Sequence, residues 1–289
     1  MPKEHNKQNV TATLLISCPD QRGIVASVSN FIFENNGNII HADQHTDQEQ
    51  KIFLQRVEWE LDGFKIPRDK TEKEFSSLAN RFGMHWRLHF SDHIPRIAIM
   101  VSTAEHCLHD LLMRQSVGEL QATIPLVIGN HHNLLPIARN FGVTFRHIPV
   151  TTKTTDEKLI LATLQEHRID LIVLARYMQI LSKDFIGRYP YKIINIHHSF
   201  LPSFAGARPY HQAYERGVKI IGATAHYATK ELDAGPIIEQ DVARASHRDS
   251  VDDLIRKGRD LERIVLARAV HLHLNNRILL YNNKTVVFD

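Results

Sequence analysis

The chain has 289 residues, of which 43% are hydrophobic and 23% are charged, as in an ordinary globular protein of one large or two modest domains. Its 35 basic and 32 acidic residues nearly balance, which argues against nucleic acid or an anionic membrane as the main partner. No stretch approaches the roughly 20 apolar residues of a membrane span, and the polar residues 1–8 lack the apolar core of a signal peptide. Cys18 and Cys107 match no disulfide or metal spacing, so we expect a protein of the reducing cytoplasm.

Nineteen histidines are present, and two pairs of them, His131–His132 and His271 with His273, have a spacing that a metal site could use. Neither pair is accompanied by a third ligand at a recognisable distance along the chain. We therefore predict no metal site and interpret these residues as surface or helix histidines.

The first 90 residues alternate between strand and helix patterns. Apolar residues recur at helical spacing from Ile24 to Glu34, and Asn35-Asn36-Gly37 ends that helix. The predicted order is βαββαβ, a ferredoxin-like fold. The expected segments are strands at 10–17, 39–46, 52–61 and 84–90, and helices at 24–34 and 70–82.

This first segment, placed at residues 8–91, resembles an ACT domain, a family of small-molecule-sensing modules. The resemblance implies a site near Asp20, Gln21, Arg22 and Gly23, where helix N-terminal amides can hold an anion such as an amino-acid carboxylate. The alternative is that this loop is a tight turn and the domain an assembly surface. Free edges of the sheet also predict pairing between chains, as a homo-oligomer that is a dimer or a tetramer.

Residues 91–95 mark a domain boundary, and the pattern after it changes to strands alternating with helices. Such alternation predicts an α/β domain over residues 95–289, with a Rossmann-like, mostly parallel sheet and helices on both faces. The expected strands are 96–101, 124–128, 144–148, 171–174, 192–194 and 221–227, with a final hairpin strand within 281–288, and the expected helices are 105–115, 134–141, 153–168, 183–189 and 252–275.

Three residues of this domain form a candidate catalytic site. Asn195 and His197 stand two apart at the end of an apolar run, so a strand would point both side chains to the same side. An amide can donate to a developing oxyanion, an imidazole can move a proton near neutral pH, and the carboxylate of Asp233 can orient that imidazole. His198 is the competitor, but its side chain should face away if the strand continues.

The run Asn195-Ile196-His197-His198-Ser199-Phe200-Leu201-Pro202, with a later Gly-x-Thr-x-His at 222–226 and Asp-x-Gly at 233–235, resembles the folate-dependent formyltransferase family. That family includes glycinamide ribonucleotide transformylase, methionyl-tRNA formyltransferase and formyltetrahydrofolate deformylase. The context of the run, continuing into residues 206–213, is most similar to the deformylase branch, and the resemblance covers nearly the whole chain.

The resemblance implies a hydrolase that acts on a linear amide, converting 10-formyltetrahydrofolate to tetrahydrofolate and formate with water as acceptor. Such an enzyme supplies formate for purine synthesis and balances one-carbon folate pools, and neither a cofactor nor a metal is implied. Asn195, His197 and Asp233 would be catalytic. Two loops would bind the folate, and their residues are Met178, Gln179 and Leu181 in one, with Ala228, Thr229, Lys230 and Glu231 in the other. The alternative for the first loop is that Met178 and Ile180 only fill the core.

Several alternatives stay open at this stage. The first βα turn of the domain, residues 101–106, lacks the glycines of a phosphate cradle, which argues against a glycinamide ribonucleotide substrate. The chain ends soon after the catalytic domain, which disfavours a tRNA substrate. A sugar-nucleotide formyltransferase and a non-catalytic amino-acid sensor are further alternatives. His226 is either near the pocket or a buried hydrogen-bonding residue, and residues 203–210, with Arg208, are candidates for closing over the formyl group or the folate tail.

Overall fold

The computed structural model describes residues 10–151, 154–202 and 209–288, and its contacts divide these residues into two compact units. The first unit holds the described residues up to His93 together with those from Asn276 onward, and the second holds Ile94–Asn275. This division departs from the expected 95–289 segment at its C-terminal end. None of the described helices combines the length and the apolar composition that crossing a membrane requires.

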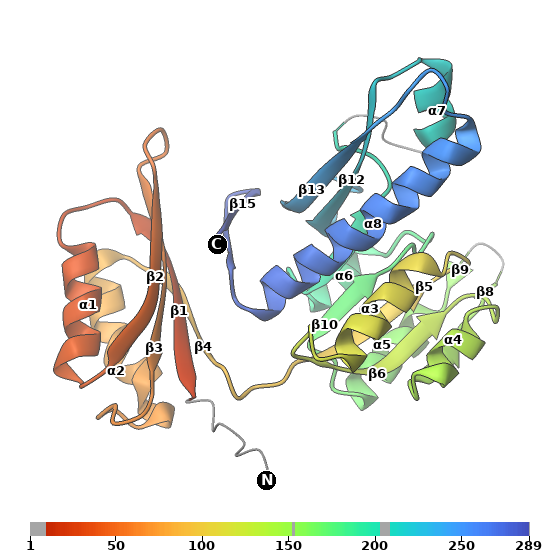
Figure 1. Ribbon diagram of the computed structural model, residues 1–289. Helices are drawn as coiled ribbons and strands as arrows, with labels where there is room; N and C mark the ends of the chain where they lie inside the picture. Colours follow the sequence, from red (N-terminus) through yellow and green to blue (C-terminus); the bar gives the residue numbers. More distant parts are fainter. Residues whose placement is uncertain (1–9, 152–153, 203–208, 289) are drawn as a thin grey trace, which may run out of the picture. The chain divides into compact units, whose positions relative to one another are not determined.

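The first unit is an antiparallel sheet of order β2-β3-β1-β4, with α1 and α2 on one of its faces (Figure 1). Trp59 and Phe75 are buried between sheet and helices, which is where the alternating apolar residues of the sheet point. The elements are β1 (Thr11–Pro19), α1 (Ile24–Glu34), β2 (Asn38–Asp47), β3 (Ile52–Glu60), α2 (Arg68–Phe82) and β4 (His85–Phe90).

A C-terminal hairpin completes the first unit. Its strands are β14 (Ile278–Tyr281) and β15 (Lys284–Val287), joined by a turn at Asn282. The side chains of Leu279 and Phe288 are buried against Leu15 and Leu54 of the sheet. Burial of these apolar side chains is the physical reason why the last residues belong with the first unit.

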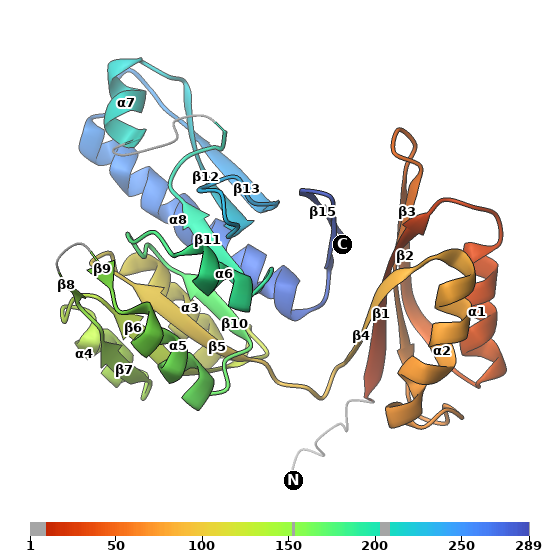
Figure 2. The same ribbon diagram turned by 180° about the vertical axis from the view of Figure 1, so that it is seen from behind.

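The second unit is a seven-stranded sheet of order β13-β12-β11-β10-β5-β6-β7. The strands from β11 to β7 are parallel, whereas β12 and β13 are antiparallel to their neighbours. Helices α3 and α8 cover the face seen in Figure 1, and α5 and α6 cover the other face, seen from behind in Figure 2. The expected α/β fold with a mostly parallel sheet is therefore confirmed.

Each element of this unit follows from its sequence. The central strands β5 and β10 are buried along nearly their whole length, as expected for strands covered on both faces. Ser250 and Asp253 form a capping box that begins α8. The elements are β5 (Arg96–Val101), α3 (His106–Ser116), β6 (Thr123–Gly129), α4 (Leu135–Asn140), β7 (Thr144–His147), β8 (Val150–Thr151), β9 (Thr154–Thr155), α5 (Glu157–Glu166), β10 (Leu171–Leu174), α6 (Lys183–Arg188), β11 (Ile193–His197), α7 (Pro209–Glu215), β12 (Ile220–Tyr227), β13 (Ile237–Arg244) and α8 (Val251–Leu274).

Candidate functional site

Strand β11 carries two of the three predicted catalytic residues at its carboxyl end. It lies beside parallel β10 and antiparallel β12, so its register places Asn195 opposite His226 and His197 opposite Thr224. Residues directly opposite each other in an antiparallel pair have side chains on the same face. The amide of Asn195 and the imidazole of His226 accordingly meet, with 3.1 Å between Nδ2 and Nε2.

The third residue, Asp233, comes from the loop that follows β12. This loop returns on itself through a hydrogen bond from the Tyr227 N–H to the Pro236 carbonyl. A Cβ at Gly235 would come within 1.7 Å of the Tyr227 carbonyl oxygen, so only glycine fits this turn. Asp233 itself has a positive φ of 54°, a conformation that Asp tolerates better than most residues. The turn places its Oδ2 atom 3.3 Å from Nδ1 of His197.

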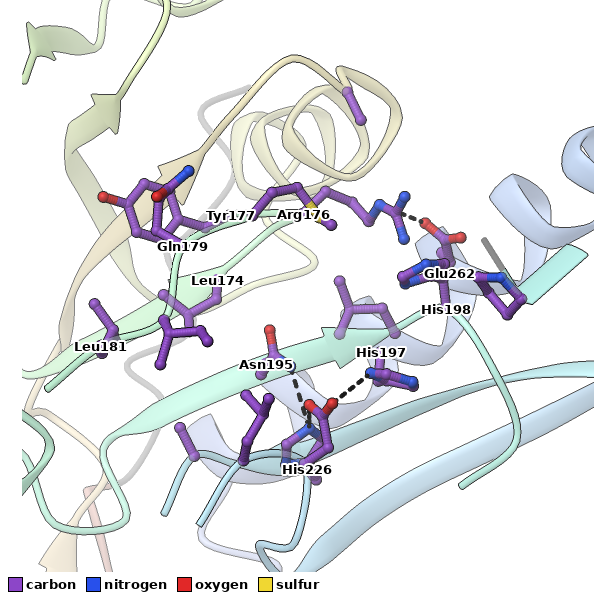
Figure 3. A pocket seen from close by; sticks show the side chains of 18 of the residues that line it. Leu174, Arg176, Tyr177, Gln179, Leu181, Asn195, His197, His198, His226 and Glu262 are labelled. Atoms are coloured by element: carbon purple, nitrogen blue, oxygen red, sulfur yellow. Dashed lines mark hydrogen bonds and ion pairs between the residues drawn. The ribbon is translucent and has the colours of Figure 1, made fainter. Parts of the chain in front are cut away.

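Hydrogen bonds fix the orientation of the Asn195 amide. A carbonyl only accepts, so Nδ1 of His226 donates to the Tyr227 oxygen at 3.0 Å. Burial lowers the pKa of His226, which keeps the ring neutral at pH 7 and leaves Nε2 as an acceptor. Asn195 therefore donates one amide N–H to that atom (Figure 3), and the residue lines the cavity, where the second N–H of its amide can meet a ligand.

His197 is paired on one side only. Its Nδ1 faces Asp233, whereas its Nε2 is buried and has no hydrogen-bond partner within the described part of the chain. The hydrogen bond to His197 lowers the pKa of Asp233 in spite of partial burial, so the carboxylate is ionised at neutral pH. An imidazole held in this way by a carboxylate is oriented for proton transfer through its other nitrogen.

A cavity of about 670 Å³ opens beside these side chains. The structure brings together at this cavity all the residues predicted to be catalytic or to bind the folate. One group follows β10 and consists of Met178, Gln179 and Leu181, and another follows β12 and consists of Ala228, Thr229, Lys230 and Glu231. Of the segment 203–210, expected to close over the formyl group or the folate tail, residues 203–208 with Arg208 lie outside the described residues, and Pro209 and Tyr210 line the cavity.

The loop after β10 is anchored to the first βα turn of the unit. The backbone N–H of Met178 donates to Oγ of the buried Ser102 at 3.0 Å. The resemblance assigns Met178 to folate binding, and this hydrogen bond already occupies its backbone N–H. Ser102 thus gives the glycine-free turn a structural role, because it fixes the position of the loop that lines the cavity.

The expectation that His198 faces away from the site is wrong. Strand β11 ends at His197, so the alternation of the strand does not extend to the next residue. His198 lines the same cavity, and its ring centroid lies 5.3 Å from that of His197. Burial, together with the positive charge of Arg176, lowers the pKa of His198 from 6.5 to about 4, so its ring is neutral at pH 7.

Comparison with known proteins places this site in a family. Residues 95–270 match the formyl transferase family, and residues 12–80 match the ACT domain family. A formyltetrahydrofolate deformylase of Synechocystis is 61% identical over 97% of this chain and 99% of its own length. A formyltetrahydrofolate deformylase of Bacillus subtilis is 47% identical over 96% of this chain and 93% of its own.

The chain belongs to the formyltetrahydrofolate deformylase family. The crystal structure of a formyltetrahydrofolate deformylase from Pseudomonas syringae matches it with a TM-score of 0.95 and 46% identity, over 99% of this chain and 96% of that one. The similarity therefore extends over both units, and the resemblance noted in the sequence is confirmed.

Sequence reasoning missed a second polar group in the deformylase-like cavity, formed by His106, Arg176, Tyr210 and Glu262. Glu262 is 1% exposed and accepts hydrogen bonds from Tyr210 Oη at 2.8 Å and from His106 Nε2 at 2.7 Å. Burial opposes its ionisation, but the hydrogen bond from His106 and the charge of Arg176 lower its pKa overall. One signal was available, because Glu262 stands at a core position of the amphipathic helix α8.

The same group raises the question of a metal site. One ligand atom each from His106, Cys107 and Glu262 lies within 4.8 Å of the others. Both carboxylate oxygens of Glu262 already accept hydrogen bonds, Oε1 from Tyr210 and Oε2 from His106. The guanidinium of Arg176, 3.5 Å from Glu262, already supplies a positive charge to this carboxylate. These features favour an ion-pair network over a metal centre.

The loop predicted to hold an effector, Asp20 to Gly23, lies in the first unit between β1 and α1. Gly23 has a φ of 91° and precedes α1, and it provides no side-chain cap for the first amides of that helix. The Gln21 side chain donates to the Phe82 carbonyl at 3.1 Å, which ties the loop to the end of α2.

Proposed function

We propose that this protein hydrolyses 10-formyltetrahydrofolate to tetrahydrofolate and formate. The observation that carries the proposal is the His197–Asp233 pair at the cavity. Nε2 of His197 has no hydrogen-bond partner among the described residues, and His197 lines the cavity together with the two candidate folate loops. Relatives named formyltetrahydrofolate deformylase match nearly the whole chain, which supports the same reaction. The glycine-free first βα turn supports water, and not a phosphorylated amine, as the acceptor.

Three side chains divide the chemistry in this proposal. His197 takes a proton from water as the water attacks the formyl carbon, and then gives a proton to N10 of the leaving folate. Asp233 holds the imidazole in one tautomer and stabilises its charged form. Asn195 uses its second amide N–H for the oxyanion of the tetrahedral intermediate, a contribution of about 3 kcal/mol in comparable sites.

The folate lies in the cavity in this proposal, with its pterin ring against the loop at 178–181 and the loop at 228–231. The apolar side chains of Leu174 and Leu181 provide a surface for a flat ring, and Gln179 offers hydrogen-bonding groups at its edge. No metal and no cofactor take part, because the held formyl oxygen makes the carbon electrophilic enough.

Replacement of His197 by alanine tests the assignment. We expect formate release to fall by at least about 10³-fold, because general acid–base transfer and its orientation are both lost. Tetrahydrofolate binding, measured by isothermal titration, should change little, since the proposed pterin loops are untouched. Full activity in the His197→Ala variant would contradict the proposed mechanism.

For the first unit we propose amino-acid sensing at the loop from Asp20 to Gly23, with the effector carboxylate on the N-terminal amides of α1. Assembly into a dimer or tetramer and a cytoplasmic location belong to the same proposal. Isothermal titration with each of the common amino acids tests the sensing role. Absence of heat with all of them would contradict it without affecting the proposed reaction.

A further inference from the structure

Arg176 presents an unmatched guanidinium at the cavity. Its side chain is 18% exposed, and its Nε and Nη1 atoms are buried without a hydrogen-bond partner within the described part of the chain. The residue also has a positive φ of 63°, a strained conformation for a side chain of this kind. A buried donor without an acceptor costs free energy, so the arrangement points to a group that supplies acceptors when it binds.

Glu262 does not satisfy this guanidinium. Its Oε2 atom lies 3.5 Å from Nε of Arg176, which makes an ion pair but leaves the N–H without a hydrogen bond. The carboxylate is instead occupied by the Tyr210 hydroxyl and the His106 ring. Gly258 makes this possible, because a Cβ there would lie 2.0 Å from the Tyr210 oxygen. Glu262 thus fixes the position of the guanidinium, and the donors of Arg176 stay available.

The guanidinium lies apart from the labelled residues of the loop at 178–181 (Figure 3). In Figure 3, Arg176, His198 and Glu262 gather at one end of the pocket, and Gln179 and Leu181 lie at the other. His198 is neutral at pH 7, so it does not compete for an anion as a second charge, and its ring lies near that of His197. Three lysine or arginine side chains line the described part of the cavity, and of these Arg176 has buried donors without a hydrogen-bond partner, whereas Lys230 and Arg259 are exposed.

We propose that Arg176 binds the formate ion produced by hydrolysis, an inference that rests on the proposed function. In the reaction, the water oxygen bonds to the formyl carbon and the bond from that carbon to N10 breaks. One proton of water goes to N10 through His197, and the other is released to solvent, which leaves tetrahydrofolate, formate and H⁺. The formyl group of the substrate is neutral, so this one-carbon group gains the negative charge that a guanidinium fork recognises only when it becomes formate.

The matched test uses sodium formate on the full-length protein without folate, at constant ionic strength set with chloride. Binding is followed by the line width of ¹³C-formate in NMR spectra. The variants are Arg176→Met, which keeps the backbone strain, and Arg176→Gly, which relieves it. The control is Arg259→Met, since Arg259 is an exposed arginine that lines the same cavity.

We expect both Arg176 variants to weaken formate binding by at least about 10-fold, as a lost bidentate contact does. Arg259→Met should change the affinity by less than about 2-fold, because an exposed charge is screened by solvent. Both Arg176 variants lose the ion pair with Glu262 and differ in backbone strain, so the melting temperature of each is measured first. Binding is then compared at a temperature at which every protein is folded, so that a loss of formate binding cannot come from unfolding. Unchanged binding in both, an equal loss in the control, or absence of binding to the unaltered protein would overturn the proposal.

A second arm distinguishes formate from the carboxylates of the folate tail. Product inhibition of turnover is measured with formate and with tetrahydrofolate for the unaltered protein and for Arg176→Met. Weaker inhibition by formate alone supports the proposal, whereas weaker inhibition by tetrahydrofolate alone assigns Arg176 to the folate tail and overturns it. Because the NMR titration needs no turnover, failure of the proposed hydrolysis would be seen separately, as formate binding without activity.

Discussion

Stability of the second unit should depend on pH through His198. This residue has a pKa of about 4 in the folded protein, compared with 6.5 ordinarily, because burial and the charge of Arg176 disfavour its charged form. The unfolded chain therefore binds a proton more readily than the folded one. Stability from this source is complete above pH 6.5 and falls as the pH drops towards 4. Between pH 7 and pH 5 the loss is roughly 2 kcal/mol.

Replacement of His198 by glutamine isolates this contribution, since glutamine does not titrate. Urea unfolding of the unaltered protein and of the variant is followed at pH 7 and pH 5 by far-ultraviolet circular dichroism. The unaltered protein should lose roughly 2 kcal/mol more than the variant between the two pH values. Tryptophan fluorescence is an internal control, because both tryptophans, Trp59 and Trp86, lie in the first unit. Equal losses in the two proteins would refute the reasoning.

Further changes probe the catalytic loop and its neighbours. Asn195→Ala should lower kcat about 100-fold, because one oxyanion donor is lost. Asp233→Asn should lower kcat on the order of 10³-fold, because the carboxylate that orients the imidazole is lost. Normal formate release by either variant would contradict the role proposed for the residue that it replaces. Gly235→Ala should lower the free energy of unfolding by roughly 2–4 kcal/mol, because the new Cβ meets a backbone carbonyl. The control is Gly187→Ala, which has open space around it and should leave thermal stability unchanged or raise it. Glu262→Gln should lower the free energy of unfolding by roughly 3 kcal/mol, because it removes one partner of the buried ion pair with Arg176. An unchanged melting temperature would contradict a stabilising role for this ion pair.

The sequence predicted the fold where hydrophobic periodicity was strong. The continuous apolar run of β10 and the amphipathic pattern of α8 each gave an element within one or two residues of its observed bounds. Strand β13, Ile237–Arg244, was missed because it is an edge strand of mixed polarity, and α7 was missed because seven residues carry little periodicity. The return of the C-terminal hairpin to the first unit depends on long-range burial that no local pattern contains.

The candidate site, like the fold, could be predicted from the sequence only in part. Period-2 geometry predicted that Asn195 and His197 share a side, and both line the cavity. The same rule gave the wrong side for His198, because it holds only within a strand and β11 ends at His197. Arg176 and Glu262 are 86 positions apart, so only the packing of α8 against the sheet brings their charges together. Contacts of this kind are set by tertiary structure and not by motifs.

The central claim is that water is the acceptor of the formyl group, and an acceptor test addresses it most directly. The protein is incubated with 10-formyltetrahydrofolate alone, and tetrahydrofolate absorbance and formate release are monitored together. Hydrolysis predicts equal release of both products without any added amine. No turnover under these conditions, with turnover restored by glycinamide ribonucleotide or an amino sugar nucleotide, would contradict the claim and make the protein a transferase.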